Sequence, residues 1–107
     1  MSENERELMA RAAGGDAAAL EGLLQAHRLR LSGYIAKQIP QSMRPLIDPQ
    51  DVVQDTYFEA FRRMAGLGAS GEPSAYPWLA TIARNRIVDL ARAHRSLKRG
   101  SWFEGVA

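Results

Sequence analysis

Apolar side chains recur at steps of three and four residues in three stretches of this chain, and that spacing limits its fold more than any other feature. Residues three and four apart share one face of an α-helix, so each stretch predicts a helix with one buried stripe. No stretch shows the sustained apolar and polar alternation that a half-buried strand needs. We therefore predict an all-α fold, a compact bundle of about four helices.

The three inner stripes are expected to pack against one another. They consist of Leu20, Leu23, Leu24, His27, Leu31, Tyr34 and Ile35; of Val53, Tyr57, Ala60, Phe61 and Met64; and of Leu79, Ile82, Ala83, Arg86, Ile87, Leu90 and His94.

Capping residues and helix breakers predict where the helices begin and end. A short helix over residues 3–13 precedes two glycines, and Asp16 suits the N-cap of a second helix that Pro40 stops. Asp48 followed by Pro49 predicts the start of a third helix, because proline fits the first helical position. The glycines in residues 66–68 predict the end of this helix, and Ser74 or Pro77 predicts the start of the last helix. The last helix is expected to fray near Gly100.

Size and composition predict one domain. The chain has 107 residues, of which 46% are hydrophobic, and this suffices for a single core. We place a helical domain at residues 1–99 and a tail, or the start of an interdomain linker, at residues 100–107. The absence of cysteine excludes disulfides, thiolate metal sites and cysteine nucleophiles. The acidic start is not a signal peptide, and no apolar run is long enough to span a membrane, so no membrane partner is expected.

Charge is unevenly distributed although the net charge is only +2. Residues 1–26 hold five acidic and two basic side chains, whereas residues 84–99 hold six basic and one acidic. A basic stripe on a helix is typical of nucleic-acid binding, but it is also common on a solvated helix face.

The acidic face, defined here as Asp51, Gln54 and Asp55, lies on one side of the third predicted helix, and Glu59 extends it by a turn. It suits a basic partner surface, although an ordinary solvated helix side would have the same pattern. Carboxylates four residues apart can also share a cation. Because no matching ligand cluster accompanies them, we predict no metal site.

The basic face is the outer side of the last predicted helix. Arginine and asparagine side chains can bind phosphates and base edges there. Tyr76 and Trp78 stand at the entrance of the helix, where an aromatic ring can stack on an unpaired base, although Trp78 also suits a core position. The basic face consists of Thr81, Arg84, Asn85, Val88, Arg92 and Arg95, with Arg99 one turn further on.

The glycine loop, residues 66–73, lies between the third and fourth helices and is either a recognition loop or a plain connector. It is not a phosphate-binding loop, because no strand precedes it and no Gly-Lys-Ser/Thr follows. Elsewhere, His27 and His94 are isolated and no acid–base constellation is evident. We therefore predict that the chain is not an enzyme, has no catalytic residues and needs no cofactor.

Two segments resemble bacterial RNA polymerase sigma factors of the sigma-70 family. Residues 48–63, DPQDVVQDTYFEAFRR, are similar to the family's D-[LVI]-[VI]-Q-[DE]-T-[FY] segment. Residues 75–89, AYPWLATIARNRIVD, are similar to its W-L-x-x-I-A-R-N-x-x-x-D helix. Their order and separation also match, and the small size resembles the extracytoplasmic-function (ECF) group.

The resemblance implies a region 2 domain that takes part in transcription initiation in the cytoplasm. It would dock on the clamp coiled coil of core RNA polymerase, and it would recognise and melt the promoter −10 element through the non-template strand. An anti-sigma factor is a further candidate partner. The implied polymerase-binding residues are Asp51, Gln54, Asp55, Tyr57, Phe58 and Phe61. The implied DNA-binding residues are Tyr76, Trp78, Thr81, Arg84, Asn85, Val88, Arg92 and Arg95, and the implied base-capture loop is Gly68, Ala69, Ser70, Gly71 and Glu72.

Departures from the family pattern leave other classes open. The family's second domain, which reads the −35 element, is missing from these residues, and the connector over residues 40–47 is long and marked by prolines. A helical protein-interaction module and a sequence-independent nucleic-acid binder therefore remain alternatives.

Overall fold

The fold is all-α, as predicted. The computed structural model describes the backbone of residues 2–106 and the side chains of residues 4–96. Within that part of the chain there is no strand. The helices are α1 (Ser2–Ala13), α2 (Ala17–Gln38), the 3-10 turn η1 (Gln41–Met43), α3 (Pro49–Arg62), the 3-10 turn η2 (Met64–Gly66) and α4 (Tyr76–Val106).

The predicted caps form at the starts of α2 and α3. Asp16 accepts a hydrogen bond from the amide of Ala19, and the preceding Gly15 has a φ of 105°, which favours glycine. Asp48 accepts from the amide of Gln50, and Pro49 occupies the first turn of α3. These local signals fix where the two helices enter the bundle.

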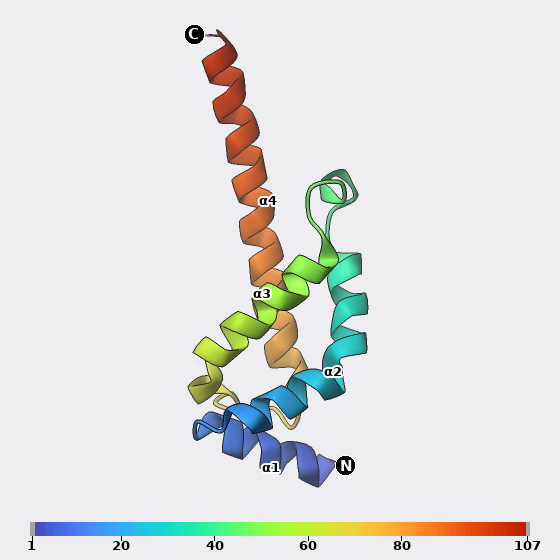
Figure 1. Cartoon of the computed structure of the whole chain (residues 1–107), viewed down its shortest axis with the longest axis vertical. Helices are drawn as coiled ribbons and strands as arrows, with labels where there is room; N and C mark the ends of the chain where they lie inside the picture. Colours follow the sequence, from blue (N-terminus) through green and yellow to red (C-terminus); the bar gives the residue numbers. More distant parts are fainter. Residues whose placement is uncertain (1, 107) are drawn as a thin grey trace.

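The core lies where α2 meets the other three helices. The α2 stripe is confirmed at Leu20, Leu23, Leu24, Leu31 and Ile35, all of which are buried. Burial of one such side chain stabilises a fold by roughly 1.5–3 kcal/mol. Figure 1 shows α1 beneath the first half of α2, with α3 crossing α4 above them. The acidic face and the basic face are therefore carried by neighbouring helices.

The predicted inner stripe of α3 was partly wrong. Val53 and Ala60 are buried, but Phe61 is 36% exposed, and Val52 and Thr56 are buried in its place. Thr56 donates its hydroxyl to the carbonyl of Val52 at 2.7 Å, so its own helix satisfies the group and burial leaves no unpaired donor. The buried face of α3 therefore includes the polar residue Thr56 and leaves Phe61 at the surface.

The α4 stripe needs a similar correction. Arg86 is exposed, whereas Ala91 is buried, and His94 is only half-buried. Two predicted ends also differ, because α3 ends at Arg62, before the glycines, and α4 passes Gly100 to reach Val106. The molecule measures 59 × 23 × 21 Å, and Figure 1 shows the second half of α4 projecting beyond the other helices.

Side chains of the predicted tail, residues 100–107, and of Arg99 lie outside the described residues. In the described part of the chain, no helix has the length and apolar character needed to cross a membrane.

Candidate functional site

The acidic face occupies the outer surface of the first half of α3. Asp51 and Gln54 are exposed, and Asp55 is partly covered. The Asp48 cap and Pro49 set the start of the helix, so Asp51 falls in the first turn. A carboxylate there interacts favourably with the positive end of the helix dipole. This surface presents negative charge and amide groups to a partner without any change of fold.

The three aromatic residues of α3 have different surroundings. Phe58 is 61% exposed and Phe61 is at the surface, so both apolar rings are available for contact. Tyr57 is half-buried against the core, and its hydroxyl has no hydrogen-bond partner among the described residues. Burial raises the pKa of Tyr57, with the nearby Arg28 acting in the opposite direction. Phe58 is therefore the aromatic most able to enter an interface.

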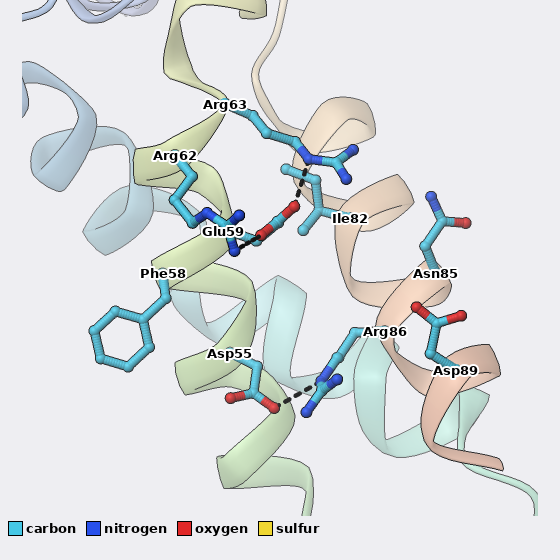
Figure 2. A pocket seen from close by; sticks show the side chains of 9 residues that line it. All are labelled: Asp55, Phe58, Glu59, Arg62, Arg63, Ile82, Asn85, Arg86 and Asp89. Carbon is cyan, nitrogen blue, oxygen red and sulfur yellow. Dashed lines mark hydrogen bonds and ion pairs between the residues drawn. The ribbon is translucent and has the colours of Figure 1, made fainter. Parts of the chain in front are cut away.

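A groove of about 290 Å³ separates the outer sides of α3 and α4, and Figure 2 shows its lining. Asp55 and Arg86 close one end through a 2.8 Å hydrogen bond from Nε of Arg86 to Oδ2 of Asp55. At the other end, Glu59 holds Arg62 and Arg63 in ion pairs. Phe58 lines the groove from α3, and its ring extends to the left of that helix in Figure 2. The groove thus has mixed charge and is flanked by one exposed ring.

Sequence reasoning missed the role of Arg86. We placed this residue in the inner stripe of the last helix, but it reaches across to α3 and pairs with the acidic face. The available signal was a charged residue within an otherwise apolar stripe, next to a helix that carries carboxylates. Such a residue seldom remains buried unless it is paired.

The basic face forms as predicted in position. Its six residues, Thr81, Arg84, Asn85, Val88, Arg92 and Arg95, are all exposed on α4. Thr81 donates its hydroxyl to the carbonyl of Pro77 at 2.9 Å, so that proton is already engaged by the helix. Asn85 also lines the groove, beside Asp89 (Figure 2). Among the described residues, the arginines and Asn85 of this face make no side-chain hydrogen bond or ion pair.

The two aromatic residues at the start of α4 are not free to stack on a base with their whole ring, because each already contacts other parts of the fold. The guanidinium carbon of Arg30 lies 3.7 Å from the centre of the Tyr76 ring, which is a cation–π geometry. The centres of the His27 and Tyr76 rings are 5.9 Å apart. Trp78 is half-buried against the core. Tyr76 is therefore engaged by α2, and Trp78 offers only part of its surface.

The glycine loop lies against α1. Gly68 and Gly71 have φ angles of 83° and 78°, a conformation that side-chain-bearing residues rarely adopt. Ala69, Ser70 and Gly71 are exposed, whereas Gly68 and Glu72 are half-buried. A hollow of about 330 Å³ separates the loop from α1. Arg6, Met9 and Ala10 of α1 line it, residues for which the sequence had given no site role.

A half-buried junction adjoins this hollow, because Glu5 and Ser74 are the chain neighbours of two lining residues, Arg6 and Pro73. Glu5 of α1 accepts hydrogen bonds from His27 and from the amide of Ala75. Burial opposes ionisation of Glu5, but the bonds from His27, Ala75 and Ser74 outweigh it, so the pKa of Glu5 lies below its usual value. Within the described residues, this junction included, no group of three or more carboxylate or imidazole side chains is arranged to hold a metal ion.

Comparison with known proteins gave one family. The family described as Sigma-70 region 2 matches residues 23–97, a span that holds the acidic face, the glycine loop and the basic face. Comparison with curated proteins and with solved structures gave no match.

Proposed function

Because the chain belongs to the sigma-70 region 2 family, which binds RNA polymerase and recognises promoters, we propose that it docks on the clamp coiled coil of core polymerase and opens the −10 element. One observation carries this proposal. A single small bundle presents an exposed acidic face on α3 and an exposed basic face on the adjacent α4. Two surfaces of opposite charge suit two partners of opposite charge, one protein and one nucleic acid.

Docking is assigned to the acidic face together with Phe58. Asp51 and Gln54 are exposed, and within the described residues neither side chain makes a hydrogen bond or ion pair. Asp55 contributes while paired to Arg86, and Phe58 adds apolar area beside the carboxylates. Aromatic residues often supply much of the binding energy at such interfaces. Tyr57 and Phe61 support this surface from its edge.

DNA binding is assigned to the basic face and the glycine loop. Arg84, Arg92 and Arg95 would neutralise phosphates, and Asn85 would hydrogen-bond a base edge. The loop would capture a base from the non-template strand. An open strand is the preferred ligand, because its base can enter the loop without the cost of leaving a duplex stack. Tyr76 and Trp78 frame the entrance of the helix. We place this activity in a bacterial cytoplasm and within the ECF group, and we include an anti-sigma factor as a candidate competitor for the same surfaces.

The proposed role is binding rather than catalysis, with no metal or cofactor required. The supporting feature is that each proposed contact uses charge, hydrogen bonding or stacking and needs no reacting group. A stoichiometric metal ion whose removal abolishes binding would contradict this part of the proposal.

Competition for core RNA polymerase tests the docking role. Asp51→Asn, Gln54→Ala and Phe58→Ala should each weaken binding to core enzyme, while their unfolding free energies stay within about 0.5 kcal/mol of the parent. Glu21→Gln, which removes an exposed carboxylate from α2, is the matched control and should bind normally. Unchanged binding in all three variants would reject the assignment and favour a protein-interaction module that uses another face.

A further inference from the structure

Glu5 joins three parts of the fold through one carboxylate oxygen. Its Oε1 accepts from Nε2 of His27 on α2, from Oγ of Ser74 at 3.3 Å and from the amide of Ala75 at 3.2 Å. The side chains of Glu5 and His27 are only 22% and 14% exposed. Hydrogen bonds to a carboxylate in such surroundings are stronger than those between neutral groups. Glu5 thus links α1, α2 and the start of α4 through hydrogen bonds, and this set of three hydrogen bonds is called the tie.

The tie completes a helix cap that the local sequence provides only in part. The carbonyl of Ala75 accepts the first helical hydrogen bond of α4, from Leu79, which puts an alanine at the N-cap position. Alanine has no side-chain acceptor and is a poor N-cap. Ser74 accepts from the amide of Tyr76, and Glu5 takes the amide of Ala75. The negative carboxylate also suits the positive end of the helix dipole.

Helix α1, which carries Glu5, also holds the first part of the glycine loop. Met9 of α1 and Leu67 at the loop start are both buried in the core cluster. A Cβ built on Gly68 would lie 3.9 Å from Cε of Met9, which places the methionine against that turn. The loop is therefore held by α1 at Leu67 and Gly68, and the chain is held again just past the loop, at Ser74 and Ala75. Its middle, Ala69 to Gly71, is exposed, as are Gly66 and Pro73, whereas Gly68 and Glu72 are half-buried.

The structure assigns Glu5 as a positioning residue for base recognition by the glycine loop. This inference rests on the proposed function of the loop. Glu5 lies outside residues 23–97, the part that matches the family, so α1 supplies an element that the match does not include. By fixing the end of the loop in advance, Glu5 lowers the conformational entropy that the loop loses when a base enters it. Base selection should depend on it, whereas contacts between phosphates and the basic face should not.

The test measures base discrimination separately from total affinity. A fluorescein-labelled single-stranded 12-mer is first selected from a random pool with the parent chain, and each position is then changed to the other three bases. Anisotropy gives the ratio between the best and the worst base at every position. Gly71→Ala, at a φ of 78°, identifies the position that the loop reads. At that position Glu5→Ala should lower the ratio about fivefold, an effect the size of one hydrogen bond although three are lost, because the loop keeps its anchor at Leu67 and Gly68. Binding to oligo(dT) should change less than twofold.

Matched variants separate positioning from general destabilisation. Glu5→Gln keeps the acceptor for Ser74 and Ala75 and should restore most of the discrimination. Glu7→Ala removes an exposed carboxylate from the same helix and should leave it unchanged. Ile35→Val, in the core of the second half of α2, gives a destabilised chain with an intact tie. It should keep the parent ratio. Ser74→Ala removes one donor to Glu5, and with it the acceptor for the amide of Tyr76, and should still give a smaller loss than Glu5→Ala.

The outcomes distinguish the two levels of the proposal. Equal ratios in the parent and Glu5→Ala, or equal losses in Glu5→Ala and Ile35→Val, would overturn the positioning role and leave base reading intact. A parent with no base preference at any position would overturn base reading by the loop, and the positioning role with it. Faster amide exchange at Ala75 in Glu5→Ala but not in Glu7→Ala would support the tie itself, and equal exchange in both would overturn it.

Discussion

Asp55 on α3 accepts a 2.8 Å hydrogen bond from Nε of Arg86 on α4, so one ion pair joins the acidic face to the helix that carries the basic face. Both side chains are more than one third exposed, at 37% and 44%. Exposed pairs of this kind contribute little to stability because water and salt screen them. The pair is therefore more important for the charge that each face presents than for holding the bundle together.

Arg86→Gln should strengthen binding to core polymerase by about two- to fivefold, because Asp55 then presents its full negative charge to a basic partner. The unfolding free energy should change by less than about 1 kcal/mol. Competition binding at low and at high salt checks the first expectation, and urea unfolding checks the second. Asp55→Asn combined with Arg86→Gln should lose this gain, whereas weaker binding by Arg86→Gln alone would contradict the argument.

Tyr57→Phe should leave the domain as stable as the parent or more stable by up to about 1 kcal/mol. The buried hydroxyl of Tyr57 has no partner among the described residues, so its removal relieves a desolvation cost and breaks no bond. Chemical denaturation measures this directly. Polymerase binding should also persist in Tyr57→Phe, in contrast to Phe58→Ala. A loss of more than 1 kcal/mol would mean that the hydroxyl is hydrogen-bonded in solution.

Much of the fold was predictable because its signals are local. Caps at Asp16 and Asp48, and the leucine stripe of α2, depend only on residues within a few positions of one another. The positions of the acidic and basic faces follow from the same helical spacing. The errors arose where the choice depends on a neighbouring helix. Whether Thr56 or Phe61 faces inward is decided by α2 and α4, and Thr56 can be buried only because Val52 accepts its proton.

The contribution of α1 was beyond prediction for a similar reason. Glu5 and Ala75 are 70 positions apart, and nothing near either residue indicates that they meet. Arg86 gave a weak signal, because a charge in an apolar stripe suggests a partner, but its partner on α3 is 31 positions away. Contacts between distant segments follow from the packing of whole helices, which periodicity alone does not specify.

Acid should destabilise the domain partly through Glu5. The pKa of Glu5 is lower in the fold than its ordinary value of 4.5, so the folded state binds the proton less readily than the unfolded chain. Its stabilising contribution is fully present above about pH 4.5 and is lost as the pH falls through the lower folded value. Asp16, whose pKa is also lowered through its hydrogen bond with Arg11, acts in the same direction. Glu5→Gln should therefore lose less stability between pH 5 and pH 3 than the parent.

Thermal unfolding across that range provides the measurement. Glu7→Gln, which neutralises an exposed carboxylate on the same helix, should retain the parent's acid dependence. If the acid dependence of Glu5→Gln also equals that of the parent, the carboxylate of Glu5 is not stabilised by its three donors.

The basic face should determine how DNA affinity depends on salt. Arg92→Ala and Arg95→Ala should each weaken binding of single-stranded −10 DNA of any sequence, because they remove phosphate contacts and not base contacts. Each should also reduce the slope of log affinity against log salt by about 0.7, the value for one phosphate contact on a single strand. Lys37→Ala, which removes a positive charge from the end of α2, should leave the slope unchanged.

Asn85→Ala should behave differently from the arginine variants. Loss of a base-edge contact should reduce discrimination between bases by about 1–3 kcal/mol while the salt slope stays the same. Anisotropy titrations with matched and scrambled single strands, from 50 to 300 mM salt, measure both quantities for one set of variants. Duplex DNA should bind more weakly than the open strand, because its bases must first leave the stack at a cost of a few kcal/mol. Equal affinity for matched, scrambled and duplex DNA would reduce the basic face to a general electrostatic surface.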